Sequence, residues 1–395
     1  MNRRTLGAVL VTAMTATVLM AVPATASQGV STPGLSGRYP VGTREVHAVD
    51  PGRADPWVPQ RRRELMLTVS YPAARAGGPR APWLPSGVAA AFTQLAASPE
   101  FLGLPAGTVD WTSVRRRAVL DAAPARGRWP VVLFSPGFAG PREFYADKVD
   151  DLASRGYVVV SMSHTFESAA VQFPDGRVEY GRADVGNGAD KKKAIDTRVA
   201  DTRFVLDRLA DLSFADTSRI GMAGHSYGGY TTGETMVVDR RVKAGVNIDG
   251  ALGHGVGQYL PGRVVTEGLD RPFLLFGGDD VDPVTGRELE HSHVDRDLDP
   301  SWADFWATQR GWKRDLHLDR STHFSFTDLQ FIVPQVRAHL PAGAQERVIG
   351  TVNPTRSVAA QRDYLAGFFD LHLKGWDRHL FAGSSPCHPD TRLIP

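Results

Sequence analysis

Cysteine is almost absent from this sequence, since Cys387 is the only one among 395 residues. A single cysteine excludes an intramolecular disulfide framework and a zinc site built from several thiolates. Cys387 lies in a polar tail beside prolines, and we expect no catalytic role for it. The stability of the fold must therefore come from a hydrophobic core.

An excess of charge of one sign is also missing. Lys and Arg number 45 against 43 Asp and Glu, and without the first 26 residues, which contain Arg3 and Arg4 and no acid, the balance is 43 against 43. Without a basic excess the chain has little with which to neutralise phosphates, so we expect no nucleic-acid partner. A hydrophobic share of 42% excludes a disordered chain.

Long apolar runs are confined to the N-terminus. There, two arginines precede the apolar stretch Leu6–Val22, and Ala24-Thr25-Ala26 supplies the small residues that a signal peptidase accepts. This order predicts a signal peptide at residues 1–26, a mature chain that begins at Ser27, and secretion to the extracellular space. Because no later segment has about 18 consecutive apolar residues, we expect no membrane-spanning helix.

From residue 130 onward, short apolar runs alternate with helical patterns. Val131–Phe134 is apolar throughout, as in a strand buried on both faces of a sheet. We predict strands at 131–134, 157–160, 219–223, 242–248, 272–276 and, last, 315–318, and helices at 143–154, 191–212, 230–236 and 362–373. This alternation predicts an α/β fold, a mostly parallel sheet with helices on both faces. Functional sites in such sheets lie beyond the carboxyl ends of the strands.

The chain before residue 130 is less regular. A polar arm at 27–42 leads into two predicted strands, 44–49 and 65–71. Residues 73–129 then form an excursion with one Ala-rich helix near Gly87–Ala97, and a second insertion is predicted near 284–312. The length exceeds the roughly 250–300 residues of a simple single core. We expect a single domain at 27–395 that carries both insertions.

The segment Gly224-His225-Ser226-Tyr227-Gly228 is a G-x-S-x-G motif in a specific setting. An apolar run leads into it, and a helix-compatible segment follows. A sharp strand-to-helix turn of this kind projects a serine hydroxyl outward, and the glycines let strand and helix approach closely. The motif therefore predicts Ser226 as a catalytic nucleophile.

A serine nucleophile needs donors for the developing oxyanion. The loop Phe134–Gly140 follows the first of the central strands, where a backbone N–H can lie beside the nucleophile. We assign the two oxyanion donors to the backbone N–H groups of Phe138 and Tyr227.

The serine also needs a base, and a neutral imidazole is the usual one. In hydrolases with a strand–elbow–helix nucleophile, the chain order is serine, acid, histidine, with the histidine after the last strand, which selects His323 among 12 histidines. His225, inside the elbow, is expected to point away from the site. Four other loop histidines are interpreted as structural: His164, His254, His291 and His293.

The acid is not decided by the residues alone. Asp249 ends the strand after the nucleophile strand, at an apolar position, while Asp279 and Asp280 end the next strand, with Asp282 close by. Each could orient His323 and stabilise its imidazolium. The choice between Asp249 and the later pair stays open at this point.

Large apolar side chains gather in both insertions, and two roles are possible for them. They could line an acyl pocket and touch a lipid surface, or they could extend the core over the sheet. These residues are Trp83, Leu84, Phe92, Leu95, Trp302, Phe305, Trp306 and Trp312.

Taken together, these segments resemble the platelet-activating factor acetylhydrolase family, the secreted calcium-independent phospholipase A2 type. The resemblance is carried by Phe134–Phe138, Asp151–Val159, Ser163–Ala169, Gly224–Gly229 and Asp249-Gly250. Two features depart from the family: Pro136-Gly137 stands where a His-Gly pair is common, and the stretch between Asp249 and His323 is long.

The resemblance implies an α/β-hydrolase fold and hydrolysis, without metal or cofactor, of short acyl esters of phospholipids or related lipids. It also implies Asp249 as the acid, since the family takes it from the strand after the nucleophile strand. The expected partner is a small-molecule or lipid ester, with transient lipid-surface contact as an option and the oligomeric state undetermined. The alternatives are a triacylglycerol lipase or a polyester-cleaving esterase and, less favoured, a non-enzymatic lipid-binding scaffold.

Overall fold

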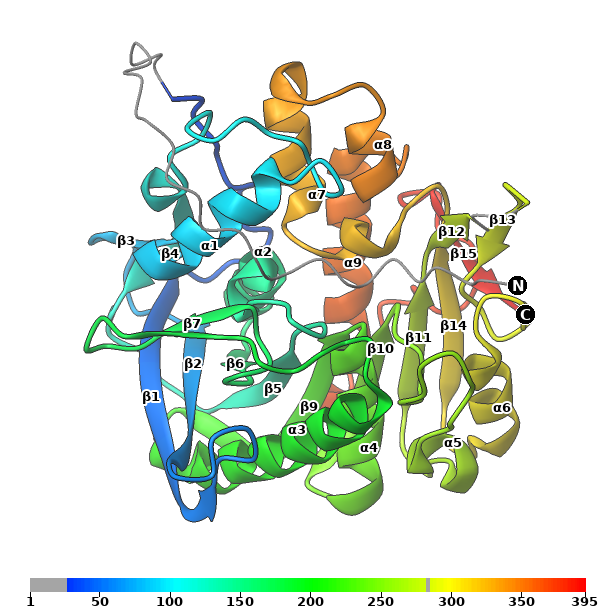
Figure 1. The fold of residues 1–395 in the computed structure, drawn as a ribbon. Coiled ribbons are helices and arrows are strands. Elements are labelled where there is room, and N and C mark those ends of the chain that lie inside the picture. The colour runs from blue at the N-terminus through cyan, green and yellow to red at the C-terminus, as the bar shows by residue number, and fades with distance from the viewer. Residues whose placement is uncertain (1–26, 282–284) are drawn as a thin grey trace.

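The computed structural model describes residues 27–281 and 285–395. The predicted signal peptide and Asp282 lie outside the described residues. An eleven-stranded sheet runs through the molecule in the order β15-β14-β11-β10-β9-β5-β6-β2-β1-β4-β3 (Figure 1). Its strands are β1 (Val41–Ala54), β2 (Arg62–Pro72), β3 (Arg80–Pro82), β4 (Arg115–Leu120), β5 (Trp129–Ser135), β6 (Val158–Ser163), β9 (Ala215–His225), β10 (Val242–Ile248), β11 (Phe273–Gly277), β14 (Lys313–Leu318) and β15 (Thr391–Ile394).

The centre of the sheet is parallel, and the strands that flank it pair mostly in antiparallel register, with β1 and β4 as a parallel exception. Strands β6, β5, β9, β10, β11 and β14 pair in parallel, whereas β2 joins β6, and β1 joins β2, in antiparallel register. Every residue from Val131 to Phe134 is fully buried, as expected for strands covered on both faces. The predicted α/β fold with a mostly parallel sheet is confirmed.

The prediction that residues 315–318 form the last strand is wrong. The C-terminal strand β15 pairs antiparallel with β14, with Leu316 opposite Leu393, and forms the edge of the sheet. The four residues of β15 are too few to show a periodic pattern in the sequence. They form a strand because they pair with the free edge of β14.

Two layers of helices cover the sheet (Figure 1). The helices are α1 (Ser86–Ala97), α2 (Ala146–Ser154), α3 (Gly188–Arg208), α4 (Tyr227–Val238), α5 (Arg263–Glu267), α6 (Pro300–Thr308), α7 (Leu329–Ile332), α8 (Ala344–Ile349) and α9 (Pro354–Phe369). Alternation along β5 separates two cores: Val132 and Phe134 face α1, α2 and α7–α9, while Val131 and Leu133 face α3–α6.

Several predicted elements match the structure closely, whereas the helix predicted at 362–373 is observed as α9 at Pro354–Phe369. The predicted strand at 242–248 coincides with β10, and the Ala-rich helix near 87–97 is α1. Several short elements went unpredicted, among them β3, β4, the hairpins β7 (Ala170–Gln172) with β8 (Val178–Tyr180) and β12 (Asp279–Val281) with β13 (Glu288–Glu290), and the helices α5, α7 and α8. The predicted helix at 143–154 begins with a 3-10 turn, η2 (Arg142–Tyr145).

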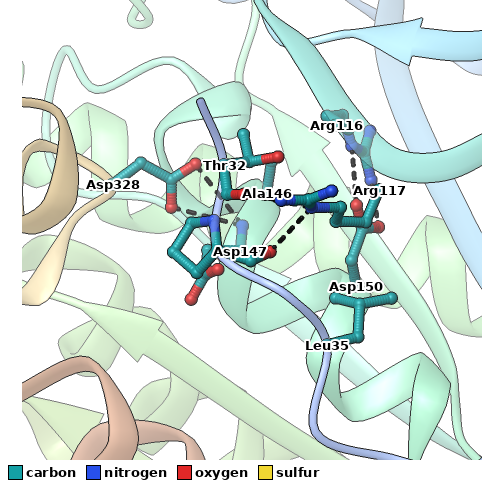
Figure 2. Close-up of a pocket in the computed structure, with 9 residues that line it drawn as sticks. Thr32, Leu35, Arg116, Arg117, Ala146, Asp147, Asp150 and Asp328 are labelled. Carbon is teal, nitrogen blue, oxygen red and sulfur yellow. Dashed lines mark hydrogen bonds and ion pairs between the residues drawn. The ribbon is translucent and has the colours of Figure 1, made fainter. Parts of the chain in front are cut away.

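The predicted polar arm is free of helix and strand from Ser27 to Pro40 and lies over α2. There it covers a cavity of about 10 Å³, the space of about one water molecule (Figure 2). Arg116 and Asp150 form an ion pair in its wall, and the Asp328 carboxylate accepts the Asp147 N–H at 3.2 Å. The lining residues are Thr32, Pro33, Leu35, Arg116, Arg117, Ala146, Asp147, Asp150 and Asp328, none of which is a predicted site residue.

Within residues 27–281 and 285–395, no helix combines the length and the apolar character that a bilayer crossing demands.

Candidate active site

Ser226 lies in a strained turn between β9 and α4. Its backbone has φ 55° and ψ −125°, a conformation that a residue with a Cβ rarely adopts. The Ser226 N–H donates to the Ile248 carbonyl at 2.7 Å, which ties the turn to the end of β10. The motif glycines are needed here, because a Cβ on Gly228 would lie 1.9 Å from the Ser135 carbonyl oxygen.

His323 follows β14 at the start of a short 3-10 turn, η4 (His323–Phe326). A capping box between Thr322 and Ser325 holds this turn. His323 Nδ1 lies 2.6 Å from Asp249 Oδ2, so the structure brings the predicted base to the predicted acid.

Asp249 is buried at the carboxyl end of β10 with φ 54°. Its Oδ1 accepts the Gly278 N–H at 3.1 Å. Burial by itself would raise the pKa of Asp249, but hydrogen bonds from His291 and His323 hold that pKa well below its ordinary value. The carboxylate is therefore ionised throughout the neutral range.

The two later candidates for the acid lie elsewhere. Asp279 Oδ1 lies 2.8 Å from His317 Nε2, and Asp279 also accepts the Arg320 N–H. Asp280 caps its own turn by accepting the Val281 N–H at 2.8 Å. In this structure, it is Asp249 that contacts His323.

The expectation that His225 points away from the site is wrong. Its ring lies 4.4 Å from the His323 ring, and its Nε2 donates to the His323 carbonyl at 3.0 Å. Since that carbonyl can only accept, Nδ1 is the acceptor of the Tyr145 hydroxyl at 2.9 Å, and this hydroxyl accepts the Gly137 N–H at 3.1 Å. Burial and the neighbouring His323 lower the pKa of His225 well below its ordinary value, so His225 stays neutral.

The loop after β5 is held from behind by Arg198 of α3. The Arg198 guanidinium donates to the carbonyls of Pro136 at 2.7 Å and Gly137 at 3.0 Å, and it forms a buried ion pair with Glu167. In a trans peptide the N–H is opposite the C=O, so the Phe138 N–H is directed away from Arg198.

Neither the Phe138 N–H nor the Tyr227 N–H donates a hydrogen bond to any other described residue. The two residues are neighbours, because their rings pack edge to face with centroids 5.4 Å apart. The segments that carry these two donors adjoin Ser226, since Tyr227 follows it in the chain and a Cβ on Gly137 would lie 3.3 Å from the Ser226 Cβ. Two unpaired backbone donors are what an oxyanion requires.

Behind this loop lies a buried polar chain that the sequence did not reveal. Ser135 Oγ contacts His164 Nε2 at 3.0 Å, and His164 Nδ1 contacts Asp201 at 3.0 Å. Asp201 in turn pairs with Arg63. His164 is thus a structural histidine, as expected.

His291 was expected to be a structural loop histidine away from the site, but it contacts the predicted acid. Its Nδ1 lies 2.9 Å from Asp249 Oδ1, on the opposite carboxylate oxygen from His323. No spacing rule linked His291 to Asp249, because His291 lies within the second insertion and belongs to no motif.

Among the described residues, one set of side chains has the spacing that could hold a metal ion: His225, Asp249 and His323. Both ring nitrogens of His225, and the His323 nitrogen that faces Asp249, already bond to protein groups. Hydrogen bonding accounts for this cluster, and the absence of a metal or cofactor stays a prediction.

Most of the large apolar residues in the insertions belong to the core. Trp83, Leu84 and Phe92 are buried in the layer under α1, and Trp302 and Phe305 are buried in the opposite layer. Trp306 and Trp312 pack against these cores half-buried. Leu95 is 40% exposed and Phe324, next to His323, is 38% exposed.

Comparison with known proteins finds two matching families. The family described as platelet-activating factor acetylhydrolase, isoform II, matches residues 24–177, and the prolyl oligopeptidase family matches residues 151–252. The chain is 32% identical over 274 residues to a probable 1-alkyl-2-acetylglycerophosphocholine esterase of Arthroderma benhamiae, covering 67% of this chain and 66% of the relative. It is 26% identical over 152 residues to a platelet-activating factor acetylhydrolase of Cavia porcellus, covering 31% of this chain and 35% of the relative.

The chain thus spans just under two thirds of the fungal relative and about a third of the mammalian one. Among solved structures, a ferulic acid esterase from Streptomyces cinnamoneus is similar with a TM-score of 0.75 and 34% identity. That likeness covers 93% of this chain and 100% of the esterase.

The tight turn at Ser226 leads to a prediction about stability. Gly228→Ala should destabilise the fold by about 3 kcal/mol, because the new methyl group collides with the backbone of β5. Gly188→Ala, at the first turn of α3 with no atom within 4 Å of the added Cβ, is the matched control and should leave stability within about 0.5 kcal/mol. Urea unfolding measures both, and equal midpoints would contradict the packing described here.

Proposed function

Because this chain belongs to the platelet-activating factor acetylhydrolase family of the α/β-hydrolase superfamily, we propose that it is a carboxylic ester hydrolase with Ser226, His323 and Asp249 as its triad. The observation that carries the assignment is the 2.6 Å contact between His323 Nδ1 and Asp249, formed beside a serine in a strained elbow. The family relatives are named as esterases and acetylhydrolases, which supports ester hydrolysis as the reaction.

The contact between His323 and Asp249 supports a proton path through the proposed triad. Since His323 Nδ1 donates to Asp249, its Nε2 is the basic nitrogen that takes the Ser226 proton as the hydroxyl oxygen attacks the ester carbonyl. The imidazolium then protonates the leaving alcohol, and an acyl-enzyme on Ser226 remains. His323 then takes a proton from a water molecule, whose oxygen attacks the acyl-enzyme. The imidazolium returns this proton to Ser226 Oγ as the Oγ–acyl bond breaks, so the carboxylic acid leaves and the free hydroxyl is restored.

The oxyanion of each tetrahedral intermediate is bound by the backbone N–H groups of Phe138 and Tyr227. Both donors are free of internal partners among the described residues. Arg198 keeps the Gly137–Phe138 peptide in the orientation that presents the donor, so the hole is formed before substrate binds. Pro136 has no backbone N–H to donate, and its carbonyl accepts from Arg198.

For the substrate we favour short-acyl phospholipids or related lipid esters. The fungal relative is named for an acetyl ester of an alkyl glycerophosphocholine, which supports this choice. Phe324 beside His323 is partly exposed and packs edge to face on Phe101, 5.3 Å between ring centroids, so an apolar rim is available for transient contact with a lipid surface. The pattern of residues 1–26 supports secretion of the mature chain.

A second substrate class is an ester of an aromatic acid. The ferulic acid esterase from Streptomyces cinnamoneus matches this chain over more of its length than the acetylhydrolases do. The same triad serves both classes, because Ser226 attacks the ester carbonyl, which both classes share, and the classes differ only in the rest of the acyl group.

The triad assignment is tested by labelling and substitution. A fluorophosphonate should label Ser226, and Asp249→Asn should lower kcat by about three to four orders of magnitude, because His323 loses the acceptor that fixes its tautomer. Asp279→Asn is the matched control and should leave kcat within a few-fold, since Asp279 pairs with His317. Labelling elsewhere, or the reverse order of the two variants, would overturn the assignment.

The oxyanion loop is tested at Arg198. Arg198→Lys keeps the charge that Glu167 needs but loses the paired bonds to two carbonyls, so kcat should fall about tenfold or more with little change in KM. Arg63→Lys, a buried arginine of the adjacent network, should lower the melting temperature while kcat below that temperature is retained. An Arg198→Lys enzyme with normal kcat would show that the loop holds its orientation unaided.

The substrate class is tested on one panel with the purified mature chain. We expect the highest kcat/KM on acetyl and butyryl esters, including a 2-acetyl phospholipid. The value should fall steeply for acyl chains beyond about eight carbons, which is the profile of an enzyme for short-acyl lipid esters. Higher kcat/KM on methyl ferulate would favour the aromatic-acid class. A preference for long triglycerides or for a polyester film would favour the lipase and polyesterase alternative.

A further inference from the structure

Two histidines, not one, hold the carboxylate of Asp249. His323 Nδ1 lies at Oδ2, and His291 Nδ1 lies 2.9 Å from Oδ1. The Gly278 N–H adds a third bond, to Oδ1 at 3.1 Å. The triad described above uses only the His323 contact, which leaves His291 without a role.

The second nitrogen of His291 also faces a carboxylate. His291 Nε2 lies 3.2 Å from Asp299 Oδ2, and the residue is buried, with 7% of its surface exposed. An ionised carboxylate can only accept hydrogen bonds, so both ring nitrogens must carry a proton for both contacts to be bonds. The geometry therefore describes an imidazolium between two carboxylates.

The energetics of the ring agree with this geometry. Burial lowers the pKa of His291, but its hydrogen bonds to Asp249 and Asp299 outweigh burial and raise the pKa to about 10. Burial likewise opposes the ionisation of Asp299, and its bond with His291 nevertheless holds the pKa of Asp299 below its ordinary value.

The second insertion places His291 with several independent contacts. The Trp302 ring stacks on the imidazole with centroids 4.0 Å apart and planes at 26°, and the Trp302 indole N–H donates to the Gly250 carbonyl at 2.8 Å. Asp299 caps the N-terminus of α6 by accepting the Ser301 N–H at 2.9 Å. His291, α6 and the turn that carries Asp249 are thus one packed unit.

We propose that His291 is a positively charged positioning residue of the triad, which shares the Asp249 carboxylate with His323 and thereby weakens His323 as a base. This inference rests on the proposed function. A carboxylate that already binds one cation attracts a second one less strongly, so Asp249 stabilises the imidazolium that forms on His323 less than an unshared aspartate would. The pH dependence of the reaction should therefore change when the charge on His291 is removed.

Few other groups can alter the charge at His323. From β9, His225 faces it but stays neutral, and from β10, Asp249 stays ionised. Lys148 of α2 lies behind His225 beside Asp328, whose pKa burial and Asp147 raise to about 7. His317 and Asp279 pair with each other at the neighbouring strand ends. A comparison of variants that leaves all of these in place isolates His291.

The chain supplies a matched control in His293. This residue lies two positions away in the same loop, stacks on Trp306 with centroids 3.9 Å apart, and contacts Asp315 at 2.7 Å. It therefore reproduces the ring, the tryptophan and the carboxylate of His291, but it has no contact with Asp249.

The first test measures the rate of fluorophosphonate labelling of Ser226 against pH in wild type, His291→Gln and His293→Gln. We expect the acid limb of the His291→Gln profile to move up by about one pH unit, because the lost positive charge lets His323 hold its proton longer. The His293→Gln profile should coincide with that of wild type. A folded His291→Gln enzyme with an unmoved limb, or an equal movement in His293→Gln, would overturn the proposal.

The second test needs no activity and separates this proposal from the assignment of function. In the protein labelled with ¹⁵N-histidine, the His291 nitrogens should show the doubly protonated form at pH 8, and Asp299→Asn should lower the pH at which this form is lost. A neutral His291 ring at pH 8 would overturn the proposal even in an active enzyme. If Ser226 takes no label while His291 is an imidazolium, the proposed function fails and the charge assignment stands.

The positive charge on His291 should also make the folded state less stable as the pH rises. A histidine whose pKa is raised from 6.5 to about 10 on folding stabilises the fold fully below pH 6.5 and loses this contribution as pH rises to about 10. In wild type the urea midpoint should fall across this window, and His291→Gln should flatten the fall. An identical slope in both proteins would contradict a charged His291.

Discussion

The buried carboxylate of Asp249 is the constraint around which the site is arranged. Removing an ion from water costs several kcal/mol unless nearby partners compensate it. Here the compensation comes from three separate segments: the turn after β11 that carries Gly278, the loop that carries His291 and the turn that carries His323. Since each segment comes from a different part of the chain, satisfying one carboxylate also brings the reacting groups together.

The same principle operates on the other side of Ser226. Arg198 is a buried cation, and its partners are Glu167 and two carbonyls of the oxyanion loop. Carbonyls that must face a guanidinium leave the opposite side of their peptides free to donate. Buried charge at two places therefore determines the orientation of backbone groups that have no charge of their own. Ser226 and Asp249 have strained backbones with positive φ, and a hydrogen bond holds each of them: the Ser226 N–H donates to the Ile248 carbonyl and the Asp249 N–H to the Phe276 carbonyl.

Sequence reasoning reached the general plan because the plan depends on local patterns. Apolar runs such as Val131–Phe134 and Val242–Ile248 indicate buried strands without any knowledge of their neighbours. Elements that depend on contacts made elsewhere were missed, as with β15, which exists because β14 offers an edge. From the sequence, the aromatic residues of the insertions could either line an acyl pocket or extend the core. The burial of Trp83 and Trp302 shows that these two belong to the core.

What the sequence determined by itself is the chemistry available: a serine in an elbow, a histidine after a late strand and acidic residues at strand ends. These follow from residue type and order, which need no coordinates. Only the tertiary structure decided which carboxylate contacts His323, because Asp249 and Asp279 both end parallel strands and differ only in where neighbouring turns direct them. The place of His291 was decided there too, since burial between two carboxylates depends on how a distant insertion folds back over the sheet.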